Sequence, residues 1–151
     1  MNDDWYDLLV ALLDADARFL VVGAHALAVH GVPRGTQDID IWVDPDPGNT
    51  ERVWRALSVF GAPASALGIE FADLQRPNSV VQFGLPPNRI DLMTSISGIS
   101  SFATAWQGHV DHPVRGRMVP FLGRGALLVN KRASARRKDL ADVEALGERP
   151  D

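Results

Sequence analysis

The sequence predicts a single domain of the α/β (α+β) class, with a mixed β-sheet flanked by helices. Segments whose apolar residues recur at helical spacing alternate with short strand-like segments along the chain. The length of 151 residues is enough for one domain that buries its own core. No repeat, low-complexity segment or linker is visible. We therefore expect one domain over residues 1–151, with a core at about residues 18–95 and a helical C-terminal part at about residues 123–148.

The first third of the chain alternates helix and strand. Apolar residues at helical spacing in residues 5–13 predict a helix that lies on a core. The apolar run of residues 18–22 predicts a strand that ends at Gly23, and the alanine-rich residues 24–30 predict a short helix after a tight turn. Residues 36–43 alternate with period two, which predicts a strand with acids on one face and isoleucines on the other.

The rest of the chain holds shorter elements. The pair Asp46-Pro47, or Asn49, can cap a helix that closes at Gly61. The further expected elements are a loop-rich stretch at 62–78, a hairpin of strands 80–83 and 89–93, a short helix at 102–106, a strand at 117–121, a helix at 126–133, and a last helix whose apolar face is Leu140, Val143 and Leu146.

Composition excludes several classes of protein. With no cysteine, the chain has no disulfide, thiol nucleophile or cysteine-based zinc site, so a metal would be held by oxygen or imidazole. Hydrophobic residues at 46% and charged residues at 23% exclude a wholly disordered chain. No apolar run is long enough to span a membrane, and the acidic N-terminus lacks the positive start of a signal peptide. We expect a cytoplasmic protein.

The net charge of −4 hides an asymmetry between the two parts of the chain. Residues 1–100 carry six arginines and thirteen acids, whereas residues 101–151 carry nine basic residues and six acids. Residues 115–138 carry eight basic residues and no acid. Such a segment favours a polyanionic partner, so it predicts contact with RNA or a partner protein, the alternative being a solvated helix surface. The sequence leaves the oligomeric state open.

Three aspartates are the first candidates for chemistry. Asp38 and Asp40 lie two residues apart on a predicted strand, so their carboxylates share a face with Cα atoms about 6.6 Å apart. Like charges so close need a cation or strong donor, and Mg²⁺ takes one or two carboxylates together with substrate phosphates. Asp91, between Ile90 and Leu92, repeats the pattern and could hold a second ion or accept a proton. The alternative is an ordinary exposed strand face.

A glycine turn precedes this acidic strand. Gly23 ends one predicted strand and begins a helix, a geometry in which free backbone N–H groups can bind a phosphate. Gly23 alone is weak evidence because turns need glycine for conformational reasons. A possible phosphate site, a possible metal site and a third acid nevertheless follow one another along the chain, and the three could serve one reaction on a metal-bound phosphate.

The combination of Gly23-Ala24, Asp38-Ile39-Asp40 and Asp91 resembles the signature of the nucleotidyltransferase superfamily with the DNA polymerase beta type of palm. Residues 22–31, with Arg34 and Thr36, are similar to the bacterial branch that includes AbiEii-type toxin transferases. Residues 130–133 and 138–143 match the closing helices of that branch. The resemblance implies a nucleotidyltransferase-like sheet, Mg²⁺ (two ions), a nucleoside triphosphate as substrate, and a toxin–antitoxin component as one role to test.

The resemblance assigns a role to each candidate residue. Asp38, Asp40 and Asp91 are the catalytic and metal-binding residues. Ala24 replaces the usual second glycine or serine, which removes a hydroxyl but leaves the backbone donors. We place Lys131 ahead of Lys138 because Lys138 can pair with Asp142 four residues later. The expected nucleotide-binding residues are Gly23, Ala24, Arg34, Thr36, Lys131 and Lys138. Arg34 and Thr36 rank second among them, the alternative for these two being packing of the loop before the acidic strand.

Two functions remain open at this stage. The first is Mg²⁺-dependent transfer of a nucleoside monophosphate to a hydroxyl of an RNA or tRNA end, a protein or a small molecule. The second is a catalytically silent module of the same fold that binds nucleic acid or a partner protein. His25 and His30 do not share a helix face well enough to bind one metal, so we expect them to be structural or to support the residues that contact the ligand. His109 and His112 flank Asp111, where we expect a surface loop rather than a zinc site.

Overall fold

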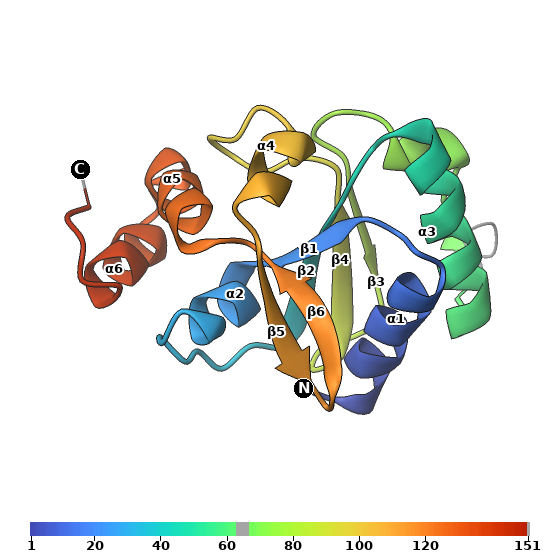
Figure 1. Cartoon of the computed structure of the whole chain (residues 1–151), viewed down its shortest axis with the longest axis horizontal. Helices are drawn as coiled ribbons and strands as arrows, with labels where there is room; N and C mark the ends of the chain where they lie inside the picture. The colour runs from blue at the N-terminus through green and yellow to red at the C-terminus, as the bar shows by residue number, and fades with distance from the viewer. Residues whose placement is uncertain (63–66, 151) are drawn as a thin grey trace.

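The computed structural model, which describes residues 1–62 and 67–150, is built on a six-stranded mixed sheet (Figure 1). The strand order is β3-β4-β2-β1-β6-β5. Strand β1 pairs antiparallel with β2 and parallel with β6, and β2 pairs parallel with β4. The strands are β1 (Phe19–Val22), β2 (Asp38–Val43), β3 (Val80–Phe83), β4 (Arg89–Met93), β5 (Val110–Val114) and β6 (Arg117–Phe121).

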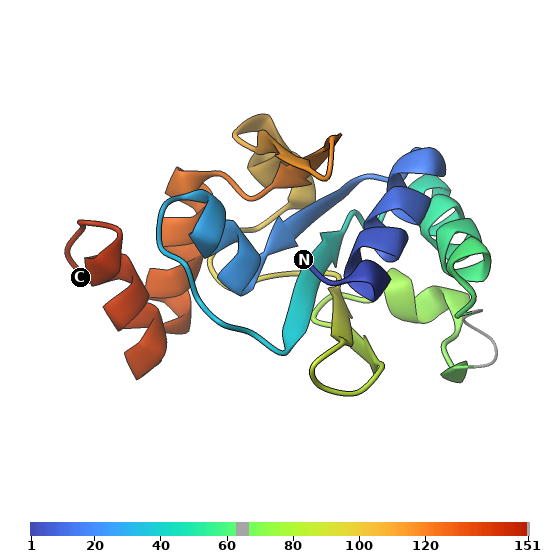
Figure 2. The ribbon, with the colours of Figure 1, turned by 90° about the horizontal axis from the view of Figure 1, so that it is seen from below.

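The longer helices lie in two pairs at opposite ends of the sheet. Helices α1 and α3 lie side by side at one end, and α5 and α6 lie together at the other, beside α2 (Figures 1 and 2). The helical segments are α1 (Asp3–Asp14), α2 (Gly23–Val29), α3 (Pro47–Phe60), η2 (Phe71–Leu74), α4 (Phe102–Gln107), α5 (Arg124–Ser134) and α6 (Arg137–Ala145). None of the helices described is long and apolar enough to cross a bilayer.

Local sequence explains where α1 and α3 begin. The Asn2 side chain accepts a hydrogen bond from the backbone N–H of Trp5 at 2.8 Å, and Asp46 caps α3 through the N–H of Asn49. Helix α3 ends at Gly61, whose φ of +94° is a left-handed conformation that glycine adopts without strain. Leu8 and Leu12, on the apolar face of α1, are fully buried, and the burial of each contributes roughly 1.5–3 kcal/mol.

The predicted fold class is confirmed, as is the hairpin of β3 and β4. The prediction of a surface loop around Asp111 was wrong, because β5 is an edge strand paired antiparallel with β6. Four of the five residues of β5 are exposed, and its sequence shows no regular apolar alternation, so the strand could not be predicted from side-chain pattern. The stretch expected to be loop contains the short helix η2, and its residues 63–66 lie outside the described residues.

Candidate active site

Sheet register brings the three aspartates together. Strands β2 and β4 pair in parallel so that Asp40 lies beside Asp91 and Asp38 lies beside Arg89. Directly paired residues of neighbouring strands point to the same face of a sheet. One carboxylate oxygen from each of the three aspartates lies within 4.8 Å of the others. This confirms that Asp38, Asp40 and Asp91 share one face.

Gly23 borders this cluster, at the point where β1 passes into α2. Its φ is +65°, and a β-carbon placed on it would overlap Asp40 Oδ2. Glycine is therefore required here both for its backbone conformation and for the close approach of the carboxylate. The sequence indicated only the first of these reasons.

Asp38 is held by two donors. Thr36 Oγ1 donates a hydrogen bond to Asp38 Oδ1 at 2.8 Å, and Arg89 Nη2 donates to Asp38 Oδ2 at 2.6 Å. Burial opposes ionisation of Asp38, but the bonds from Thr36 and Arg89 outweigh it and lower the pKa of this carboxyl. Asp38 is therefore an anion across the neutral range.

Asp40 has the opposite electrostatic character. Burial, followed by the charges of Asp38 and Asp91, raises its pKa to about 7. Burial also raises the pKa of Asp91. Asp91 Oδ1 is buried and has no hydrogen-bond partner in the described part of the chain. A cation among these oxygens would satisfy Asp91 and remove the repulsion, so the donor set fits a hard metal ion such as Mg²⁺.

Arg89 is a residue of the site that the sequence analysis missed. Its Nη2 bonds Asp38, and its Nε lies 3.6 Å from Asp91 Oδ1. One guanidinium thus partly neutralises two of the three carboxylates. Arg89 and Asp91 lie two residues apart on one strand, so both point to the face of the aspartates. This spacing could have identified Arg89 from the sequence.

The aspartates form one side of a cleft of about 640 Å³. Basic side chains from the segment before β2 and from helices α5 and α6 lie on the other side. All nine candidate residues line this cleft: Gly23, Ala24, Arg34, Thr36, Asp38, Asp40, Asp91, Lys131 and Lys138. Residues up to about 115 positions apart in the sequence are thereby brought into one site with an acidic and a basic side.

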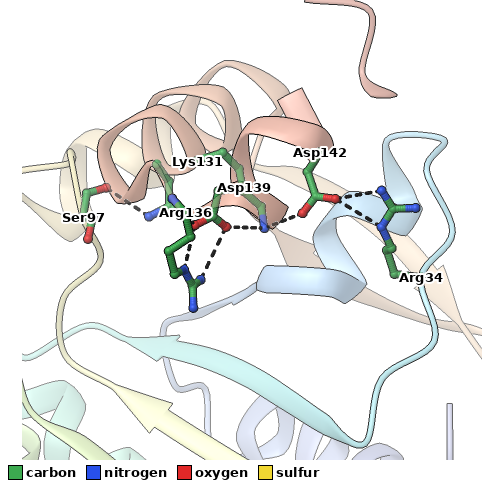
Figure 3. Close-up of polar contacts among 7 residues, drawn as sticks. Arg34, Ser97, Lys131, Arg136, Asp139 and Asp142 are labelled. Carbon is green, nitrogen blue, oxygen red and sulfur yellow. Dashed lines mark hydrogen bonds and ion pairs between the residues drawn. The ribbon is translucent and has the colours of Figure 1, made fainter. Parts of the chain in front are cut away.

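The basic side is ordered by a network of ion pairs around Lys131 (Figure 3). Lys131 Nζ lies 3.3 Å from Asp139 Oδ1 and 3.0 Å from Asp142 Oδ2, and all three residues are buried. Asp142 also binds Arg34 at 2.8 Å, and Asp139 binds Arg136 at 2.7 Å. The network joins α5 and α6 to the segment before β2.

The network changes the ranking of the two lysines. Asp142 pairs with Lys131 and Arg34, and no ion pair of Lys138 occurs among residues 1–62 and 67–150. The expected pair of Lys138 with Asp142 is therefore not formed. Lys138 lies in the first turn of α6, where the helix dipole disfavours a cation. Within the described chain, the Lys138 ammonium group has no carboxylate partner and is free to pair with a ligand. Lys131, by contrast, already pairs with two carboxylates.

The basic segment 115–138 does not form one surface. Arg115 and Arg117, on the β5–β6 hairpin, pair with Asp3 and Asp14 of α1. Arg124 pairs with Glu148 near the C-terminus. With Lys131 and Arg136, five of the eight basic side chains have a carboxylate partner. Of the other three, Lys138 lines the cleft, whereas Arg132 and Arg137 do not.

The histidines lie outside this cleft. His30 Nε2 lies 2.8 Å from the carbonyl oxygen of Leu122, and His25 packs edge-on against Trp5, in agreement with structural roles. His109 stacks on Trp106 and lies 3.1 Å from Asp111. In the part of the chain that the structure describes, the aspartate triad is the one group of three acids or histidines close enough to hold a metal.

Comparison of the chain with protein-family models, with curated proteins and with solved structures finds no match. The function is therefore argued from the cleft itself.

Proposed function

We propose that this chain is a Mg²⁺-dependent nucleotidyltransferase that transfers a nucleoside monophosphate from a nucleoside triphosphate to a hydroxyl acceptor. The observation that carries the proposal is the cleft, in which three clustered carboxylates face Arg34, Arg136 and Lys138. A triphosphate with its bound metal has the same division of charge, because the metal prefers carboxylates and the phosphates prefer guanidinium and ammonium groups.

The acidic side is assigned to the metal. Asp38, Asp40 and Asp91 would hold two Mg²⁺ ions. Bound there, the ions would neutralise charge on the triphosphate and on the reacting oxygens. Thr36 fixes the orientation of Asp38, and Gly23 leaves room for Asp40. These residues preorganise the carboxylates before substrate arrives.

The basic side is assigned to the phosphates. Arg34 lines the cleft with its guanidinium fixed by Asp142, and Lys138 lines it without an ion-pair partner among the described residues. The backbone N–H groups of Gly23 and Ala24 complete the proposed phosphate contacts. Lys131 supports Arg34 through their common partner Asp142, instead of contacting the phosphates directly.

The reaction assigned to the site is in-line displacement at the α-phosphorus. The acceptor oxygen forms a bond to this phosphorus while the bond to the bridging oxygen breaks and pyrophosphate leaves. The proton of the acceptor hydroxyl passes to the carboxylate of Asp91.

One observation favours the second candidate, a silent module that binds nucleic acid or a partner protein. Arg89 already pairs with Asp38 and lies near Asp91, which reduces the need of these two carboxylates for a metal. A module of this kind would bind its partner equally well in chelator, and its affinity for nucleic acid would fall with salt.

A place in a toxin–antitoxin pair rests on the sequence resemblance and is tested by growth arrest on expression.

A transfer assay tests the proposal. The protein is incubated with Mg²⁺, each nucleoside triphosphate labelled at the α-phosphate, and separate pools of RNA, protein and small-molecule acceptors. We expect the label to pass to one pool with release of pyrophosphate, and expect Asp40→Asn to abolish transfer while remaining folded by circular dichroism. Full transfer by Asp40→Asn would refute the assignment.

A further inference from the structure

A second cavity shares no lining residue with the cleft. It has a volume of about 540 Å³ and lies among the end of α1, helix α3, the segment that follows α4, and the β5–β6 hairpin. Arg18 of this cavity directly precedes β1, whereas Val22, at the other end of β1, lines the cleft. The two sites are therefore at opposite ends of one strand.

Two arginines line this cavity without a carboxylate partner. No ion pair of Arg18 or Arg52 is formed within the part of the chain that the structure describes. Arg52 is half-buried, and a partly buried cation without a counter-charge costs free energy. A second cation in the same cavity raises that cost, because like charges repel. Two guanidinium groups arranged in this way match an anionic group, which can accept paired hydrogen bonds from each.

The fold holds Arg18 in place. Its guanidinium lies over the ring of Trp106, 4.8 Å from the ring centre, and His109 stacks on Trp106 at 4.0 Å. Buried Asn49 accepts a hydrogen bond from the backbone N–H of Arg18 at 2.6 Å and donates one to its carbonyl oxygen at 2.9 Å. Arg52 follows Asn49 by three residues on α3. The guanidinium of Arg18 is thus oriented before a ligand arrives, which lowers the entropy lost on binding.

Two acids also line the cavity, but neither neutralises the arginines. Asp111 lies 3.1 Å from His109, and Asp16 forms no ion pair with the residues described. Both aspartates are exposed, so water solvates their charge. Among the charged groups of this cavity that lack a partner, Arg52 is the half-buried one. The group that gains most from a ligand is therefore a cation.

Apolar side chains make up much of the remaining wall. Leu13 and Pro120 line the cavity together with Met118, which is 54% exposed although its neighbours on β6 are buried. A methionine side chain is flexible and adapts to the shape of a ligand. The volume is typical of sites for small organic molecules, which occupy about 300–1,000 Å³. The cavity therefore has room for an apolar body beside an anionic head.

We propose that this cavity binds a small organic molecule that carries an anionic head, a phosphate or a carboxylate, on an apolar body. Arg18 and Arg52 bind the head, and Trp106 and Met118 contact the body. The site is separate from the cleft and does not depend on the proposed nucleotidyl transfer.

The test is a titration followed by ¹⁵N–¹H NMR, which resolves the indole N–H signals of the four tryptophans. The signal of Trp106 is assigned as the one absent from Trp106→Phe. Trp54, which lines a different cavity, supplies the internal control signal. The probes are phenyl phosphate, benzoate and, as their uncharged counterpart, benzyl alcohol.

We expect at least one of the two anions to shift the Trp106 signal to saturation at or below about 10 mM, while the Trp54 signal stays in place. Benzyl alcohol should bind at least about tenfold more weakly, because it lacks the charge that the arginines recognise. Tighter binding of phenyl phosphate would assign a phosphate head, and tighter binding of benzoate a carboxylate head, and either result supports the site. No shift of Trp106 by either anion, or equal binding of benzyl alcohol, would overturn the proposal.

Arginine variants test which side chains bind the head. Arg52→Gln should weaken binding of the anion at least about tenfold, whereas Arg55→Gln, on the same helix but at a different cavity, should bind like the wild type. Without ligand, Arg52→Gln should melt no lower than the wild type, since it loses no ion pair among the residues described. Arg18→Gln is a second variant with the same expected loss of binding. Unchanged binding by both Arg18→Gln and Arg52→Gln would refute the assignment.

Discussion

The Asp40 carboxylate lies so close to the backbone of Gly23 that a β-carbon on Gly23 would overlap Asp40 Oδ2. A turn at the end of β1 thereby controls the position of an acid on β2. The two residues are 17 positions apart, and the antiparallel pairing of Val22 with Asp40 brings them together. This contact makes the glycine part of the acidic site in addition to its role in the turn.

Gly23→Ala should therefore displace Asp40 and lose metal-dependent nucleotide binding by more than about tenfold. It should also reduce the free energy of unfolding by about 1–2 kcal/mol, because alanine is strained at the φ of +65°. Gly125→Ala is the matched control, since nothing lies near its β-carbon and its φ is not positive. Calorimetry and denaturant unfolding measure the two effects, and normal binding by Gly23→Ala would contradict the role of this contact.

The raised pKa of Asp40 predicts a dependence of stability on pH. The folded protein holds a proton on Asp40 up to about pH 7, whereas the unfolded chain releases it near pH 4. The contribution of Asp40 to the free energy of unfolding thus falls as the pH rises from about 4 to 7 and stays low above that. Asp40→Asn should gain stability relative to wild type across this interval, by a few times ~1.4 kcal/mol at most.

Mg²⁺ should offset the stability that the protein loses when Asp40 ionises. Above pH 7 the ionised aspartates repel one another, so we expect Mg²⁺ to raise the melting temperature of the wild-type protein more at pH 8 than at pH 5. The Asp38→Asn, Asp40→Asn double variant should show no Mg²⁺-dependent shift at either pH. An equal shift in the double variant would place the metal elsewhere.

Lys131→Met should destabilise the protein by about 3–5 kcal/mol, because it leaves Asp139 and Asp142 buried without their common cation. Lys138→Met is the control. It has no ion pair to lose among the described residues, so it should unfold like the wild type while binding nucleotide more weakly. Unfolding in denaturant measures the free energy of unfolding of both variants. A Lys131→Met variant as stable as the wild type would show that the buried network does not stabilise the fold.

Arg89→Met should bind Mg²⁺ more tightly than the wild type. It removes the cation that competes for Asp38 and Asp91, so the carboxylates gain more from a metal. Titration with Mg²⁺ alone tests this, with Arg76→Met as control because Arg76 pairs with Asp73 in an exposed segment. Weaker Mg²⁺ binding by Arg89→Met would instead assign Arg89 a supporting role in the metal site.

The sequence predicted most elements of the fold and all three aspartates, because these are encoded by local periodicity. Asp38 and Asp40 alternate with buried isoleucines, and Asp91 sits between apolar residues of one strand. The parallel register that places Asp40 beside Asp91 is a long-range property and follows from packing.

The missed features are of the same long-range kind. Strand β5 is defined by its backbone pairing with β6, and its side chains show no alternation from which a strand could be predicted. The partner of Asp142 was predicted from helical spacing as Lys138, but the packing of α5 against α6 supplies Lys131 instead. Arg89 was overlooked because its function depends on the neighbouring strand.

The most direct test of the central claim is calorimetric titration of the four nucleoside triphosphates into the protein, first with Mg²⁺ and then with chelator. The Asp38→Asn, Asp40→Asn double variant is titrated in parallel. The proposed site predicts that at least one nucleotide binds in Mg²⁺, that chelator abolishes binding, and that the double variant does not bind. Absence of binding by all four nucleotides, or equal binding in chelator, would contradict the claim and favour the silent module.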